Sequence, residues 1–287
     1  MASRMTSSGL GALAARVALA WIRRDPRSGE LDRTNFHGRT VSLAGGPALA
    51  AGATVGAVAG APSAVAAAAA ITAGVTGGAV GFYDDIVGNR PEQKSAKGFQ
   101  GHLGALREGR ITSGLVKIAG VGAAGLAAAA LLARDPGVRA HPARRRAGAV
   151  RRTADVLLGA GVVAGTANLL NLLDLRPGRA IKAATVIGTP LVAGRGGALT
   201  AGTLGASAAL LPADLGEEIM LGDAGANALG ALLGVALATR TGPAGRALAL
   251  AVLAALTAAS EKVSFTRVIQ DTPGLREFDA LGRRPAS

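Results

Sequence analysis

Two adjacent carboxylates stand directly after a long uncharged stretch of the sequence. Asp84 and Asp85 close the run Gly81-Phe82-Tyr83-Asp84-Asp85. An acidic residue at the end of an apolar membrane segment is costly unless it has a partner or a function. Mg²⁺ is typically bound by one or two carboxylates together with water and substrate phosphate oxygens. The pair therefore favours metal-assisted phosphate chemistry, although an aspartate pair in a solvated loop would look the same.

A second polar cluster follows about eighty residues later. Asn168, Asn171 and Asp174 are spaced by three, and this spacing keeps them near one face of a helix. Polar groups at the end of an otherwise apolar helix line a cavity or form hydrogen bonds to a neighbouring helix. Both interpretations stay open for these residues.

Several cations come immediately after this cluster. Arg176, Arg179 and Lys182 surround Pro177, and proline is favoured at the first position of a helix. The free amides of a helix start, together with nearby cations, favour binding of a phosphate group. We therefore expect Arg176 and Arg179 to contact phosphate.

A third cluster contains Asp223, in the segment 217–227. Asp223 stands among small residues before an apolar stretch, so we expect it at a helix start. Capping is the ordinary role of an aspartate there. Metal binding by Asp223 is favoured by the other acidic residues, because three acid-bearing loops fall at ends of predicted spans on the same side of the membrane.

The elements that must position these residues are predicted to be membrane helices. The 287-residue chain is 49% hydrophobic, with a mean hydropathy of +0.37 and 43 glycines, which is too apolar for an ordinary soluble domain. A spanning helix needs about 20 mainly apolar residues. The weakly charged stretches are 9–22, 41–83, 111–133, 154–173, 183–213, 224–239 and 247–260. Counting the long ones twice predicts an all-α polytopic bundle of about nine spans, with a turn near 60–63.

A soluble protein with alanine-rich buried helices is the alternative to this fold. So many consecutive uncharged stretches do not fit inside one soluble core of this size. Close packing through small residues is instead typical of helices in lipid. We expect a single bundle domain at 1–261 and a cytoplasmic tail at 262–287, with either an interfacial helix interrupted at Pro273 or a disordered basic end.

Charge sets the predicted orientation. Nine spans that start outside place 23–40, 84–112, 174–182, 214–223 and 261–287 on the inside, where basic residues are favoured. Loop 134–152 disagrees, because it carries seven arginines but falls outside. The side of this loop stays open. The net charge of +13 suits an anionic lipid surface, and no nucleic-acid motif accompanies it. Absence of cysteine excludes disulfides and thiolate ligands.

These motifs resemble those of the polyprenyl-phosphate sugar-phosphate transferases, glycosyltransferase family 4. The resemblance covers most of the chain, in the same order and spacing. The matching segments are 81–85, 168–174 and 220–225, with Asn35, Gly38, Gly45, Gly46 and Pro47 in the first inside loop and Lys97, Gly98, Gly101 and His102 in the next.

The resemblance implies an Mg²⁺-dependent glycosyl-1-phosphate transferase in the cell (inner or plasma) membrane. A polyprenyl phosphate would attack the sugar-bearing phosphorus of a UDP-sugar, and UMP would leave. The resemblance places this reaction in cell-envelope glycan synthesis. Asp84, Asp85 and Asp223 would be the catalytic residues, and Asp223 and Asp85 would hold the metal. Asn168, Asn171 and Asp174 would face the nucleotide, and Lys97 would join the phosphate contacts.

The sequence also departs from this family's pattern. Gly88, Leu175, Pro177 and Ala226 replace motif residues, and the late histidine-rich loop has no counterpart among the three histidines. A non-catalytic member that binds lipid phosphate, or that assembles with a partner in envelope synthesis, is therefore the alternative. A small transporter would need charge near mid-span, for which Lys117 is the candidate. The sugar, the acceptor length and the oligomeric state, including a homodimer, stay open.

Overall fold

A helix of small residues, α11 (Gly222–Arg240), lies at the centre of the molecule and is buried along nearly its whole length. The structure, a computed structural model, describes residues 1–88, 90, 98–145 and 148–284. A Cβ added to Gly230 would lie 2.6 Å from the Ala167 Cα of α8 (Ala149–Leu173), and one on Gly234 would lie 2.6 Å from the Val163 Cα. Glycine therefore lets the two backbones pack directly against each other, as small residues do between membrane helices.

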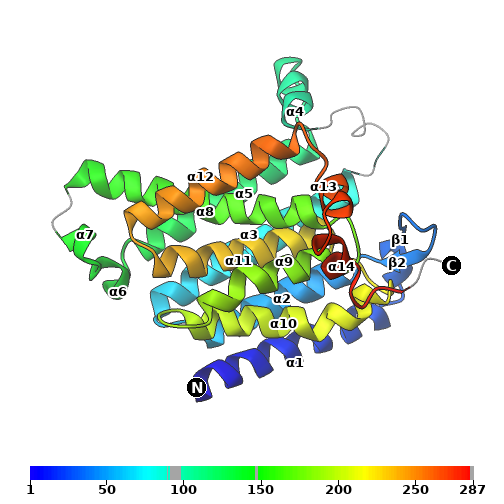
Figure 1. Ribbon diagram of the computed structural model, residues 1–287, viewed down its shortest axis with the longest axis horizontal. Helices are drawn as coiled ribbons and strands as arrows, with labels where there is room; N and C mark the ends of the chain where they lie inside the picture. The colour runs from blue at the N-terminus through cyan, green and yellow to red at the C-terminus, as the bar shows by residue number, and fades with distance from the viewer. Residues whose placement is uncertain (89, 91–97, 146–147, 285–287) are drawn as a thin grey trace.

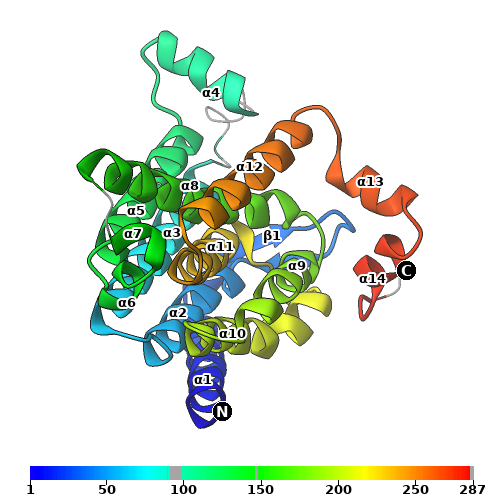
Figure 2. The same ribbon diagram turned by 60° about the vertical axis from the view of Figure 1, so that its left-hand side comes forward.

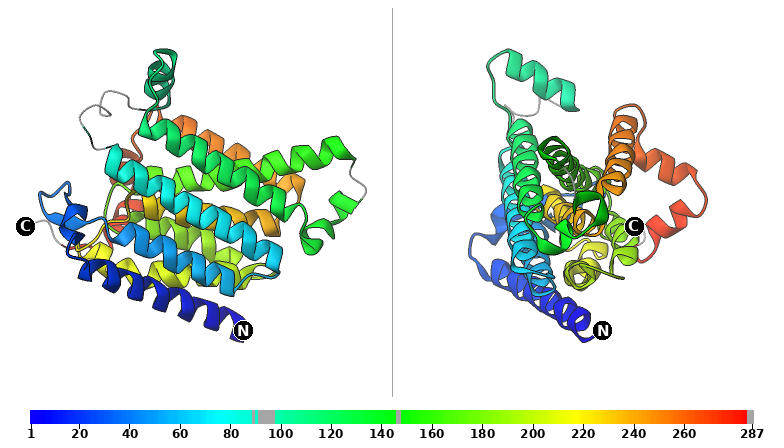
Figure 3. Two further views of the ribbon diagram at one scale, coloured as in Figure 1. Left: turned by 180° about the vertical axis from the view of Figure 1, so that it is seen from behind. Right: turned by 90° about the vertical axis from the view of Figure 1, so that its left-hand side faces the viewer.

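The remaining long helices surround α11 (Figure 1). They are α1 (Ala2–Arg24), α2 (Gly45–Ala59), α3 (Ala64–Val87), α5 (Ser113–Leu132), α10 (Gly197–Leu215) and α12 (Pro243–Ser260). In Figure 3, α1 lies along α2, and α3 lies between α2 and α5. The helix α8 packs against α5, α11 and α12, while α10 packs against α1 and α2. The predicted turn at 60–63 is confirmed, since α2 ends at Ala59 and α3 begins at Ala64.

Short elements gather at one end of the bundle. After the turn η1 (Ser28–Leu31), strands β1 (Asp32–Thr34) and β2 (Thr40–Ser42) form an antiparallel hairpin. The hairpin joins the loop before α11, because the Met220 N–H donates to the Ser42 carbonyl at 2.9 Å. The short helix α9 (Arg179–Gly188) continues into η3 (Thr189–Leu191).

The C-terminal segment consists of two short helices at the same end. They are α13 (Phe265–Asp271) and α14 (Leu275–Ala280), with Pro273 between them. Figure 2 shows them following α12 and lying near α9. The break at Pro273 agrees with the interrupted helix expected from the sequence. The opposite end carries α6 (Pro136–Arg139) and α7 (Pro142–Arg145), whereas α4 (Gly98–Arg107) projects from the side of the bundle (Figure 1).

Six described helices are long and apolar enough to cross a membrane: α1, α3, α5, α8, α10 and α12. Only 22% of the apolar window of α1 and 11% of that of α12 are buried within the protein. A soluble protein with buried alanine-rich helices would hide these faces, so their exposure favours lipid contact. The all-α helix bundle is confirmed, and the apolar spans support a membrane protein. The count of nine spans stays a prediction, since α2 is shorter and α9 spans ten residues.

Candidate functional site

The acidic residues predicted to act together come from three helices at the hairpin end of the bundle. Asp84 and Asp85 lie in the last turn of α3, and Asp223 lies in the first turn of α11. Asp174 is the residue that ends α8. Antiparallel packing of α3 and α8 against the start of α11 brings these helix ends to the same side of the molecule.

Lys117 lies between two of these acids. Its Nζ is 2.6 Å from Asp84 Oδ2 and 2.6 Å from Asp223 Oδ2. The lysine side chain is 20% exposed, and those of Asp84 and Asp223 are 12% and 23% exposed. A single ammonium thus holds two poorly solvated carboxylates together, which links α5 to both α3 and α11. Removal of one member of such a buried arrangement leaves uncompensated charge.

Sequence reasoning missed this role of Lys117. From the sequence, Lys117 is only the candidate mid-span charge of a transporter. A usable signal was present, because Lys117 is the only ionisable residue between 111 and 133 and stands near the start of that stretch. A lysine in an apolar helix needs an acidic partner, and the ends of the neighbouring predicted spans supply Asp84 and Asp223.

Asp85 has a different task from its neighbour. Its Oδ1 accepts the N–H of Asp223 and its Oδ2 accepts the N–H of Ala224, both at 2.9 Å. The first amides of a helix lack partners within the helix, and Leu221, at the N-cap position of α11, has no side-chain acceptor. Asp85 therefore caps α11 from another helix.

Gly222 makes this cap possible. It has a φ of +57°, in the left-handed region, which glycine adopts without steric penalty. A Cβ at this position would also lie 2.8 Å from Asp85 Oδ1. A larger residue here would push the carboxylate away from the amides that it caps.

Asp174 completes the acidic cluster. Its carboxylate accepts a hydrogen bond from the Gly222 backbone. Burial raises the pKa of Asp174 well above its ordinary value, and the charges of Asp214, Asp223 and Asp85 raise it further. The start of α11 thus receives carboxylates from two other helices, as its partial positive charge favours.

The two asparagines lie along α8 toward the same end. Asn168 Nδ2 donates to Thr257 Oγ1 of α12 at 3.0 Å, so this residue forms the interhelical hydrogen bond that was one of its two expected roles. Asn171 is one turn closer to Asp174 and is partly exposed. The predicted nucleotide contacts of both residues stay predictions.

The predicted phosphate-binding cations are held by other parts of the chain. Arg179 forms a two-pronged ion pair with Asp279, at 2.8 and 2.9 Å, and donates to Thr266 at 2.8 Å. Lys182 Nζ donates to the backbone carbonyls of Asp279 and Leu281, each at 2.7 Å. The C-terminal helices therefore cover this face of α9. Lys97 lies outside the described residues.

Arg176 is arranged differently. Its guanidinium lies 3.6 Å from the centroid of the Phe36 ring, a cation–π contact. Burial lowers its pKa, as do the neighbouring charges of Arg179 and Arg283. No protein acceptor among the described residues satisfies its buried NH1 group. Arg176 thus keeps hydrogen-bonding capacity that Arg179 has used.

The acids provide a two-carboxylate arrangement for a hard cation. No group of three or more metal-ligating side chains that could hold a metal gathers among the described residues. Asp84 and Asp223 nevertheless converge on one cationic centre, the Lys117 ammonium. Mg²⁺ needs only one or two carboxylates when waters and phosphate oxygens supply the other ligands. Asp84 and Asp223 fit such a site better than Asp85, whose oxygens hold the α11 amides.

An apolar groove lies on the surface formed by α1, α2 and α3. Its volume is about 570 Å³. Its walls are residues of α1, α2 and α3, with Leu31 between, and include Trp21, Pro47, Val55, Val75 and Phe82. Phe82 lies near the end of α3, so the groove reaches the hairpin end of the bundle, whereas Asp84 faces Lys117 of α5. A long apolar chain fits such a surface.

Comparison with known proteins gives no family assignment. No protein-family model matches the chain, and no curated protein matches it significantly.

Proposed function

We propose that this protein is a membrane transferase that moves a sugar 1-phosphate from a UDP-sugar to a polyprenyl phosphate, with release of UMP. The observation that carries the proposal is the Asp84–Lys117–Asp223 arrangement, with Asp85 and Asp174 beside it. Carboxylates and an ammonium at one point are suited to a divalent cation and phosphate groups together. The resemblance in motif order and the apolar groove that reaches the same end of the bundle support the same assignment.

The reaction requires positioning and charge neutralisation more than covalent assistance. An acceptor phosphate oxygen forms a bond to the sugar-bearing phosphorus, and the bond from that phosphorus to the UMP oxygen breaks. Mg²⁺, when bound, would neutralise the diphosphate. Asp84 and Asp223 would hold it, and Lys117 would turn toward the transferring phosphate. Asp85 caps the start of α11, and Asn171 and Asp174 would contact the nucleotide.

The orientation belongs to the same proposal. Nine spans with the acidic end in the cytoplasm of a cell-membrane protein would place the site where UDP-sugars are available. The apolar groove, lined by α1, α2 and α3, would then hold the polyprenyl chain in the lipid while its phosphate reaches the acids.

An activity assay tests the transferase directly. Protein purified in a neutral detergent is incubated with Mg²⁺, polyprenyl phosphate and a panel of UDP-sugars, and UMP is measured. We expect UMP release with at least one sugar, dependent on both Mg²⁺ and acceptor. Asp223→Asn should abolish it, whereas Asp271→Asn, an exposed aspartate in α13, should not. Folded protein that releases no UMP from any UDP-sugar would refute the proposal.

A second candidate is a non-catalytic protein that binds lipid phosphate or assembles with envelope enzymes. Two sets of contacts favour this candidate. Lys117 pairs with Asp84 and Asp223, and Asp279 pairs with Arg179, so these side chains are less available to a substrate. Direct binding measurements separate the two. Affinity for polyprenyl phosphate with none for UDP-sugars or UMP would select this second function.

A further inference from the structure

A large cavity lies at the end of the bundle opposite the acidic site. Its volume is about 1030 Å³. Its lining residues belong to the segment after α5, the start of α8 and the start of α12, and Figure 1 shows these segments at the left-hand end of the bundle. Five arginines line it, together with a single aspartate: Arg134, Arg139, Arg144, Arg151, Arg152 and Asp155. We call this cavity the arginine pocket.

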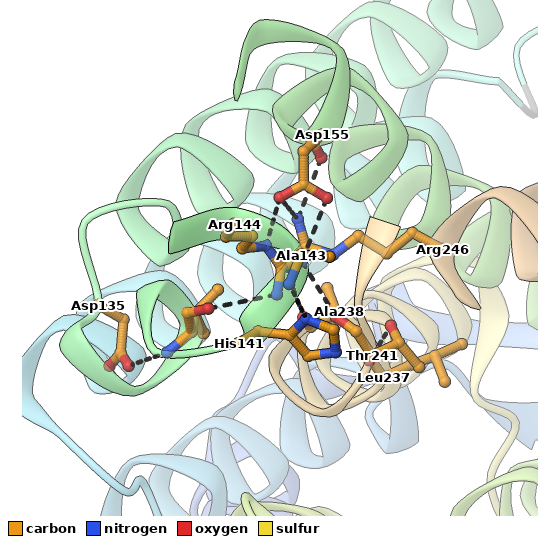
Figure 4. Close-up of polar contacts among 10 residues, drawn as sticks. Asp135, His141, Ala143, Arg144, Asp155, Leu237, Ala238, Thr241 and Arg246 are labelled. Carbon is orange, nitrogen blue, oxygen red and sulfur yellow. Dashed lines mark hydrogen bonds and ion pairs between the residues drawn. The ribbon is translucent and has the colours of Figure 1, made fainter. Parts of the chain in front are cut away.

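The aspartate is already shared by two cations. Arg144 Nε and Asp155 Oδ2 are 2.6 Å apart, and Arg246 NH1 lies 3.1 Å from the same oxygen (Figure 4). The side chains of Arg144, Asp155 and Arg246 are 9%, 8% and 0% exposed. The two buried guanidinium groups and the one carboxylate give the base of the pocket a net positive charge.

Arg144 and Arg246 also donate hydrogen bonds to backbone carbonyls at the base of the pocket. Arg144 NH2 donates to the Thr241 carbonyl at 3.0 Å, and Arg246 NH2 donates to the Ala238 carbonyl at 2.6 Å. Both carbonyls belong to the C-terminal end of α11, where a positive charge is favourable. These contacts fix the positions of Arg144 and Arg246 but bring no second anion.

The arginines at the rim of the pocket have no acidic partner in the part of the chain that the structure describes. Arg134, Arg139, Arg151 and Arg152 are exposed, and none forms an ion pair with another described residue. The nearby Asp135 does not neutralise them, because it pairs with Arg195 at 2.8 Å and accepts hydrogen bonds from Ser63 and the Val138 backbone. The pocket is therefore strongly cationic.

We propose that the arginine pocket binds a phosphate ester. Guanidinium groups match phosphate oxygens with two parallel hydrogen bonds, and several of them here surround one cavity. The remaining lining is alanine and proline, including Ala133, Ala143 and Pro243, which suits the carbon part of an ester. A phospholipid headgroup and a soluble phosphate ester share this chemistry, and basic pockets at membrane surfaces are suited to anionic headgroups.

This site is separate from the proposed transferase site. α5 runs from the acidic end to the pocket end over 20 residues, a distance of about 30 Å at 1.5 Å per residue. Binding at the arginine pocket can therefore be lost while the acidic site stays intact.

Two ligands distinguish the two sources of phosphate. Pyrophosphate binding to the protein in neutral detergent is measured by calorimetry. Retention of cardiolipin against phosphatidylcholine is measured by native mass spectrometry of the same protein from mixed micelles. The pocket variant is Arg151→Gln with Arg152→Gln. The control is Arg24→Gln with Arg27→Gln, which removes the same charge from exposed positions at the acidic end.

We expect wild type to bind at least one of the two anionic ligands in preference to phosphatidylcholine. The pocket variant should bind about tenfold more weakly, as loss of charged hydrogen bonds implies, and the control should match wild type. Preference for cardiolipin favours a lipid headgroup as the source of the phosphate, and preference for pyrophosphate favours a soluble phosphate compound. Wild type that binds neither, or a folded pocket variant that binds as well as the control, would overturn the proposal. UMP release by the pocket variant is measured separately, so failure of the transferase proposal leaves this test intact.

Discussion

Replacement of Lys117 by methionine tests the central arrangement of the acidic site. Methionine keeps a similar unbranched length but removes the ammonium between Asp84 and Asp223. The two carboxylate oxygens lie at most 5.2 Å apart, which is twice the 2.6 Å ion-pair distance. Two unit charges at that separation repel by about 3 kcal/mol at an effective dielectric constant near 20. Breaking buried ion pairs usually costs ~3–5 kcal/mol, so we expect Lys117→Met to lower the free energy of unfolding by about 3 kcal/mol.

Reversible unfolding in mixed micelles of SDS and a neutral detergent measures this change. Lys262→Met is the matched control, since Lys262 is exposed, and it should leave stability unchanged. Adding Asp84→Asn to Lys117→Met should restore part of the loss, because it removes one of the two repelling charges. The double-mutant cycle then isolates the Lys117–Asp84 coupling.

Mg²⁺ provides a second measurement on the same variants. Without the ammonium, Asp84 and Asp223 are free to bind a cation, so Mg²⁺ should stabilise Lys117→Met more than it stabilises wild type. A variant as stable as wild type, with the same response to Mg²⁺, would refute the idea that Lys117 bridges these acids.

Two further predictions concern packing and pH. Gly230→Ala should destabilise the protein by about 1–3 kcal/mol, because its Cβ would meet the α8 backbone 2.6 Å away. Gly122→Ala is the control, since a Cβ at this position has open space around it. Equal stability of the two variants in detergent would contradict direct contact between α8 and α11. Burial raises the pKa of Glu217, but hydrogen bonds from Asn35 and His37 outweigh it and hold the pKa below its ordinary 4.5. Stability from this group is present above pH 4.5 and lost as pH falls through the lower folded pKa. Thermal unfolding should therefore show that Glu217→Gln loses less stability than wild type between pH 5 and pH 3. The same pH dependence in both proteins would count against the hydrogen bonds of Glu217 with Asn35 and His37.

Much of the fold follows from local sequence. The uncharged stretches predict the apolar helices, and the break at 60–63 separates α2 from α3 as expected. Asp223 lies at a helix start, and Asp84 and Asp85 lie at a helix end. These features depend on hydropathy and on helix signals within a few residues.

Partners across the bundle could not be predicted in this way. Arg179 has the neighbours of a phosphate-binding residue, yet Asp279, one hundred residues later, occupies it. Nothing near Asp85 in sequence indicates that it caps α11. Such contacts depend on which helices pack together and on how far each is shifted along its axis relative to the other. The hydropathy of the sequence contains neither piece of information.

The sequence alone therefore determined that acidic residues end several apolar helices, and that seven arginines occupy loop 134–152. The tertiary structure decided what these charges face. Antiparallel packing of α3, α5, α8 and α11 brings Lys117 between two of the acids, and it gathers the exposed arginines around a cavity at the other end. The physical reason is that a helix end is fixed by local hydrogen bonding, whereas the environment of a charged side chain is fixed by the helices packed around it.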